Sequence, residues 1–184
     1  MVETWGTLDS SEEVATTHIG INVYTYDDWM RSVGIPVHTG FFISDLRTLE
    51  LAWWEDRGCE AAFIQLMGQE GIIEARVSEI PPGESLPPFK LSVDEVVYVV
   101  EGRGLTSVWG AGDARRQTVE WQKHSIFLLE RNRYHQFSNT RGDLPVRLLH
   151  YNYLPLAMST IPDPAFFFNN PYDAPEVEGR EFYS

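Results

Sequence analysis

One stretch of the chain alternates apolar and polar residues and is closed off at both ends. Residues 81–88 contain four prolines and one glycine, and Gly102 and Gly104 follow the alternating run. Because strand side chains point alternately to opposite faces, residues 89–100 are predicted to form a half-buried strand. Glu95 falls on its otherwise apolar face. An unpaired buried carboxylate is costly, so Glu95 is expected to have an interior partner, a raised pKa or a bound ion.

Further alternating runs predict antiparallel strands joined by glycine-containing turns. The other predicted strands are residues 61–67, 72–80, 105–109, 116–121, 134–140 and 146–153. In the second of these runs, Glu74 and Arg76 alternate with apolar residues. The simplest interpretation is that Glu74 and Arg76 form a solvated face of their strand.

Two parts of the chain, together about its central third, carry a family resemblance. The order of Gly83, Glu95 and Gly102 resembles the first signature of the cupin superfamily, and His135 and Asn139 match the second. The resemblance implies an all-β fold, a cupin-type antiparallel β-barrel (double-stranded β-helix or jelly roll). In this chain we expect the barrel to carry a short N-terminal helix and extended terminal arms.

The first signature departs from that of metal-binding cupins. The positions that carry its two histidine ligands are Phe89 and Leu91 here, so Glu95 and His135 are what remains of four ligands. Protein sites for zinc or non-haem iron usually present at least three ligands. The resemblance therefore implies a barrel with a degenerate metal site.

The chain is expected to form one structural domain with three parts. Residues 1–60 would supply an N-terminal arm, a short helix beginning at Thr25 and the first strands. Residues 61–153 would form the conserved barrel. Residues 154–184 contain prolines that interrupt regular elements, and would wrap the barrel or a neighbouring subunit. One explanation of the apolar C-terminal end is that the chain is the first half of a two-cupin protein.

Composition limits the partners that the protein is expected to have. The chain has 184 residues, 43% of them hydrophobic, and a formal net charge of −13. An acidic surface repels phosphate groups, which argues against nucleic acid or an anionic membrane as a partner. Cys59 is the only cysteine, and no signal peptide is visible. We therefore expect a cytoplasmic protein. The cupin resemblance implies a small-molecule ligand, and exposed strand edges and apolar chain ends, which a twofold partner would cover, predict a homodimer.

The first functional hypothesis is an enzyme without a metal. In it, Glu95 and His135 would face each other as an acid–base pair, suited to isomerase or lyase chemistry. The residues expected to line the substrate pocket are Phe89, Leu91, Phe137, Asn139 and Tyr151. Trp53 and Trp54 are further candidates for contact with an apolar substrate, although such a pair more often packs in a core or an interface.

Two other hypotheses remain open. Glu95, His135 and His150 could hold one divalent Fe, Mn, Zn or Ni ion in a rebuilt site, as a dioxygenase or lyase would need. Whether His150 faces inward is not decided by the sequence. Alternatively, the barrel binds a ligand or has a structural role without catalysis, and a buried Glu95–His135 hydrogen bond only joins two strands.

Overall fold

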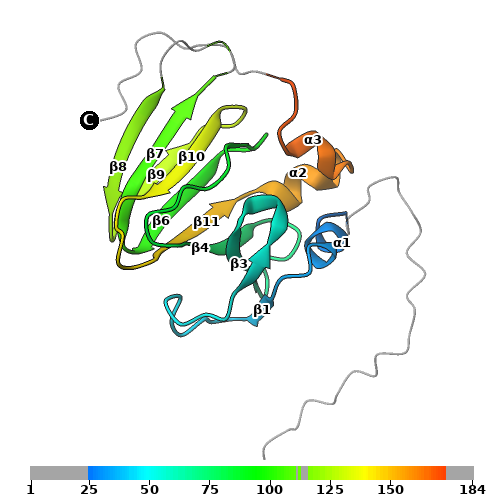
Figure 1. Cartoon of the computed structure of the whole chain (residues 1–184). Helices are drawn as coiled ribbons and strands as arrows, with labels where there is room; N and C mark the ends of the chain where they lie inside the picture. Colours follow the sequence, from blue (N-terminus) through cyan, green and yellow to red (C-terminus); the bar gives the residue numbers. More distant parts are fainter. Residues whose placement is uncertain (1–24, 111, 113–115, 173–184) are drawn as a thin grey trace, which may run out of the picture.

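Two β-sheets enclose the core, with short helices grouped beside them (Figure 1). The computed structural model describes residues 25–110, 112 and 116–172, so the expected arm of residues 1–21 and residues 173–184 of the expected wrap lie outside the description. The longer sheet contains β1 (Val37–Gly40), β2 (Ala52–Trp54), β3 (Cys59–Leu66), β4 (Glu74–Ile80), β6 (Glu95–Glu101), β9 (Ile126–Leu129) and β11 (Val146–Asn152). The shorter sheet contains β5 (Phe89–Lys90), β7 (Arg103–Trp109), β8 (Gln117–Gln122) and β10 (Tyr134–Asn139).

The all-β prediction is confirmed, and the strands pair as their alternation requires. The longer sheet runs in the order β1-β3-β4-β11-β6-β9, with β2 paired to β3, and the shorter runs β5-β10-β7-β8. The β1–β3 pair is parallel and the other pairs are antiparallel. Inward-facing residues of both sheets form one apolar cluster, to which Val97, Val108 and Phe137 belong. Burial of this shared cluster holds the two sheets together.

The predicted strand over residues 89–100 is divided between the two sheets. Residues 89–90 form β5, which pairs with β10, and the chain crosses to the longer sheet before β6 begins at Glu95. In the crossing segment the backbone forms hydrogen bonds with residues outside the strands: Ser92 N donates to Phe167 O, and Leu91 O accepts from Asn132 N. Phe89 and Glu95 therefore approach the barrel interior from different sheets.

The glycines after β6 allow the chain to return to the shorter sheet. Gly102 has a φ of 93°, in the left-handed region that glycine adopts without steric cost. A Cβ atom at Gly104 would collide with the Ser138 carbonyl oxygen and the Trp121 ring. Gly102 is thus needed for its conformation and for its close approach to Val146, and Gly104 for the close packing of β7 against its neighbours.

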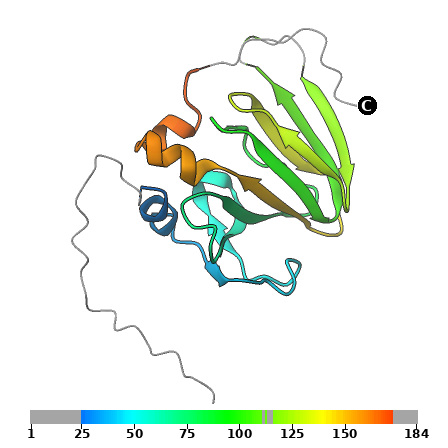
Figure 2. The same cartoon turned by 180° about the vertical axis from the view of Figure 1, so that it is seen from behind.

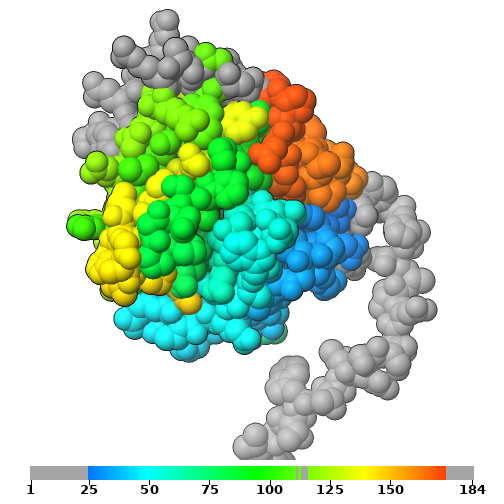
Figure 3. All heavy atoms as spheres, in the orientation of Figure 1, coloured from blue at the N-terminus to red at the C-terminus, as the bar shows by residue number. Residues whose placement is uncertain are grey.

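The helices pack together at one side of the barrel (Figures 2 and 3). They are α1 (Thr25–Ser32), α2 (Leu154–Thr160) and α3 (Pro164–Phe167), and α1 contacts the other two. A separate one-turn 3-10 helix, η1 (Glu55–Arg57), connects β2 to β3. The expectation that prolines keep the C-terminal part irregular is wrong for α2 and α3. Each has a proline in its first turn, where no intrahelical N–H is needed. Within the described residues, no helix is long and apolar enough to cross a membrane.

Candidate functional site

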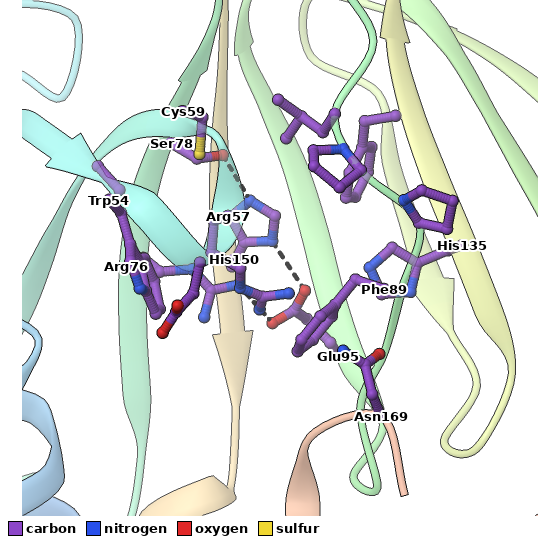
Figure 4. A pocket seen from close by; sticks show the side chains of 16 residues that line it. Trp54, Arg57, Cys59, Arg76, Ser78, Phe89, Glu95, His135, His150 and Asn169 are labelled. Atoms are coloured by element: carbon purple, nitrogen blue, oxygen red, sulfur yellow. Dashed lines mark hydrogen bonds and ion pairs between the residues drawn. The ribbon is translucent and has the colours of Figure 1, made fainter. Parts of the chain in front are cut away.

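A cavity of about 60 Å³ lies between the two sheets, and residues from both signature regions line it (Figure 4). Glu95 and His150 reach it from β6 and β11 of the longer sheet, and His135 reaches it from β10 of the shorter sheet. This volume holds about four water molecules or one small polar group. The orientation of His150, which the sequence left open, is therefore inward.

Glu95 is fixed by hydrogen bonds on both carboxylate oxygens. Its Oε1 accepts from His150 Nδ1 at 2.8 Å, and its Oε2 accepts from Arg76 Nη2 and Asn152 Nδ2, each at 3.0 Å. Burial alone would raise the pKa of Glu95, but Arg76, followed by His150, holds it well below its usual value. Glu95 is thus an anion at neutral pH with its hydrogen-bonding capacity largely used.

A second buried carboxylate shares these partners. Arg76 Nη1 donates to Glu74 Oε1, Asn152 Nδ2 donates to the same oxygen at 3.2 Å, and Tyr26 Oη donates to Glu74 Oε2 at 3.0 Å. The strand register explains the arrangement, since Asn152 on β11 lies opposite both Glu74 on β4 and Glu95 on β6. Burial raises the pKa of Glu74 although Arg76 opposes the shift.

The interpretation of Glu74 and Arg76 as a solvated face is wrong. Both side chains are buried and point into the barrel. The opposite face of β4, with Ala75 and Val77, is also covered, because the chain around Leu46 packs over it. Both faces of β4 are therefore buried. The face that carries Glu74 and Arg76 is the one that points into the barrel.

His150 is a neutral, doubly hydrogen-bonded imidazole. The Glu95 carboxylate can only accept, so His150 Nδ1 carries the proton of that bond. Its Nε2 then accepts from Ser78 Oγ at 2.8 Å. Burial lowers the pKa of His150, and the neighbouring Glu95 only partly opposes this. Both ring nitrogens therefore already have partners.

His135 differs from His150 in having an uncommitted ring. It lies in edge-to-face contact with Phe89 and Phe137, with centroid distances of 5.7 and 5.3 Å. No side chain or backbone group among the described residues forms a hydrogen bond with its nitrogens. Burial lowers the pKa of His135 to about 3, against the opposing charge of Glu95. The ring is thus neutral at pH 7 and retains one donor and one acceptor.

Glu95 of the first signature region and His135 of the second therefore meet at one cavity between two sheets of short antiparallel strands. The fold is a cupin barrel.

The chain is similar in structure to several known proteins, but its sequence identity to them is low. By sequence, the chain matches no protein-family model and no curated protein. Among solved structures it is similar to peruvianin-I, named as a cysteine peptidase from Thevetia peruviana latex, with a TM-score of 0.50 and 15% identity over 61% of this chain and 71% of that chain. It is also similar to the Schizosaccharomyces pombe Cnp3 cupin domain, with a TM-score of 0.48 and 21% identity over 59% of this chain and 71% of that domain. A Lactobacillus farciminis oxalate decarboxylase in a formate complex gives a TM-score of 0.49 and 18% identity, over 60% of this chain and 34% of that chain.

The donor set of this cavity does not fit a divalent metal ion. Both oxygens of Glu95 and both nitrogens of His150 are used in hydrogen bonds, which leaves His135 as the one uncommitted donor of the three. Arg76 lies 3.0 Å from the carboxylate that would have to bind the cation. In the part of the chain that the structure describes, no cluster of three or more His, Cys, Asp or Glu side chains is arranged to hold a metal.

The structure separates the residues expected to line the pocket into two groups. Phe89 and Phe137 line the cavity. Leu91 instead packs with the helices, and Asn139 donates to backbone carbonyls including Leu144 O at 2.9 Å. Tyr151 is 43% exposed on the outer face of β11. The expectation that Leu91, Asn139 and Tyr151 line the pocket is therefore wrong.

The cavity also has lining residues that sequence reasoning did not propose as site residues. Arg76 and Arg57 bring two guanidinium groups to it, and Trp54, one of the expected tryptophans, is buried at its edge while Trp53 is 56% exposed. No periodic pattern marks Arg57, because it ends the one-turn helix η1. Cys59 lines the cavity too, but burial raises the pKa of its thiol, which disfavours a reactive thiolate.

Proposed function

We propose that this cupin barrel binds a small molecule in the cavity beside His135, without a metal ion. The degenerate site is the starting point, since Phe89 and Leu91 occupy the expected histidine positions. The observation that carries the proposal is the buried His135 ring, which faces the cavity without a hydrogen-bond partner among the described residues. Buried polar groups normally have partners, so a bound molecule supplies what His135 lacks.

The electrostatics favour binding over an acid–base reaction. Glu95 is held ionised by Arg76 and His150, so it has no proton to donate. His135 has its pKa lowered to about 3, which makes it a weak base at neutral pH, whereas an efficient general base has a pKa near the working pH. In this proposal Glu95 belongs to the rigid scaffold and His135 makes the hydrogen bond to the ligand.

Replacing His135 by Phe is expected to weaken ligand binding while the barrel remains folded, because Phe fills the space and offers no hydrogen bond. A library of small polar molecules would be screened by saturation-transfer NMR before and after exhaustive treatment with EDTA. We expect hits that persist without metal, and at least about 10-fold weaker binding in His135→Phe, the value of one good hydrogen bond.

The matched control is His124→Asn, which alters a histidine in a turn outside the cavity. His124 has a φ of 72°, a conformation that Asn tolerates, and it bonds to Tyr98. This variant should keep the hits. One equivalent of transition metal in the purified protein, lost in His135→Ala, would overturn the metal-free proposal.

We also propose that the barrel pairs with a second copy through the outer face of the longer sheet. Tyr151 lies opposite Val96, which lies opposite Leu128 on the edge strand β9, so the three side chains form a row across the sheet. Leu128 is 49% exposed and Ile126, in the adjacent row, is 68% exposed. A second copy would cover this apolar face and the open edge of β9.

The Ile126→Glu variant is expected to convert a dimer to a monomer, since pairing would bury two added carboxylates near the twofold axis. Sedimentation velocity over the micromolar range would show the change. Thr118→Glu, on an exposed position of β8 in the other sheet, should leave the dimer intact. A wild-type protein that sediments only as a monomer would disprove the pairing.

A further inference from the structure

Arg57 lines the cavity without an acidic partner. Its Cζ lies 3.0 Å from the centroid of the Phe89 ring and 5.3 Å from that of Trp54. Arg76, by contrast, is paired with Glu74 and Glu95. Within the described part of the chain, no carboxylate is at ion-pair distance from Arg57. One of the two guanidinium groups at the cavity is therefore balanced by protein charge, and the other is not.

The surroundings of Arg57 make its lack of a counter-charge costly. Burial, followed by the repulsion of Arg76, lowers the pKa of Arg57 to about 9, so the side chain still carries its positive charge at pH 7. Stacking on aromatic rings compensates for part of the lost hydration. An anion at the cavity would compensate for much more, because a guanidinium group binds carboxylate oxygens with two parallel hydrogen bonds.

A second unsatisfied group belongs to the same wall. Trp54 is 5% exposed, and its indole Nε1–H has no acceptor among the residues that the structure describes. Indole nitrogen can only donate a hydrogen bond. Arg57 and His135 thus offer donors at the cavity that the protein itself leaves unused, and the unpaired Trp54 Nε1–H lies buried behind them. Their natural complement is a ligand rich in acceptor oxygens.

A second cavity adjoins the first and differs from it in character. It has a volume of about 270 Å³, and it shares five lining residues with the first: Trp54, Asp56, Arg57, Phe89 and Asn169. Its remaining wall is aromatic, formed by Trp29 and Phe168, whose rings stack at 4.9 Å. The outer cavity therefore suits a flat apolar group, whereas the inner cavity suits a small polar one.

We propose that the ligand is a monocarboxylate with a compact aromatic or apolar body, whose carboxylate binds Arg57 and His135 while its body packs against the aromatic wall formed by Trp29 and Phe168. The inference rests on the proposed binding function and adds the chemical class of the ligand. The inner cavity limits the polar group to about the size of a carboxylate. The position of Arg57 at the boundary of both cavities sets where the charged end meets the apolar end.

The test compares three probes by isothermal titration calorimetry: phenylacetate, its neutral analogue phenylacetamide, and acetate. Phenylacetate is expected to bind about 10-fold to 100-fold more tightly than phenylacetamide, because it alone gains a charge-assisted pair with Arg57. It is also expected to bind at least about 10-fold more tightly than acetate, because it alone fills the aromatic cavity. The Arg57→Met variant should lose the preference for phenylacetate and keep its affinity for phenylacetamide.

Arg131→Met is the matched control. Arg131 is an exposed arginine next to Asp94, away from both cavities, and its loss should leave the preference unchanged. Circular dichroism would establish that both variants are folded. Equal affinity for phenylacetate and phenylacetamide, with both lost in His135→Phe, would overturn the carboxylate inference and leave the proposed function standing. Binding that is insensitive to both Arg57 and His135 would overturn both.

Discussion

The Arg76→Met variant is expected to lose about 3 to 5 kcal/mol of the free energy of unfolding, because one substitution leaves two carboxylates buried without their cation. Glu74 and Glu95 are both at most 2% exposed, and Arg76 contacts each of them. The methionine restores packing volume but no charge. Urea denaturation followed by tryptophan fluorescence would measure the loss.

Two further variants separate burial of charge from loss of packing. Adding Glu74→Gln and Glu95→Gln to Arg76→Met removes both unpaired charges, and should recover most of the lost stability. Arg141→Met breaks an ion pair with Asp143 at the surface, and should change stability far less than Arg76→Met, because solvent screens an exposed pair. If Arg76→Met proved as mild as Arg141→Met, the buried network would not have the energetic role that its geometry implies.

Local pattern predicted the strands well because the alternation of two faces marks a strand even where its partner lies far along the chain, as β11 does for β4. The alternation at 105–109 and 116–121 became β7 and β8, and the run at 134–140 became β10. The break between β5 and β6 was not predictable in the same way. It depends on Phe167 and Asn132, which lie far along the sequence and take hydrogen bonds that a continuous strand would have used.

The site was predictable where a signature marked it and unpredictable where tertiary contacts defined it. Glu95 and His135 were found from the signatures, and both line the cavity. Alternation gave Glu74 and Arg76 a common face but not its direction, because a loop covers the other face of β4 and makes both faces interior. Arg57 reaches the cavity from a one-turn helix, where no periodicity identifies the inward side.

Stability is expected to fall as the pH drops below about 6.5, because His135 and His150 are buried as neutral rings. Their folded pKa values are depressed, so their contribution is complete above the unfolded value of 6.5 and is lost as the pH falls. For His135 this window extends down to about pH 3. Each such histidine adds a slope of about 1.4 kcal/mol per pH unit once the unfolded chain is protonated.

His135→Gln isolates the contribution of this one ring from those of its charged neighbours. Glu95, Arg57 and His150 all act on the pKa of His135, and Glu74, with its raised pKa, titrates in the opposite sense. When the free energies of unfolding of wild type and variant are subtracted at each pH, the contributions of the other titrating groups cancel. Urea denaturation between about pH 6 and about pH 4.5 should show a slope shallower by about 1.4 kcal/mol per pH unit in His135→Gln. An unchanged slope would mean that His135 takes up its proton in the folded barrel, and that water or an anion reaches the cavity freely enough to stabilise the charged ring.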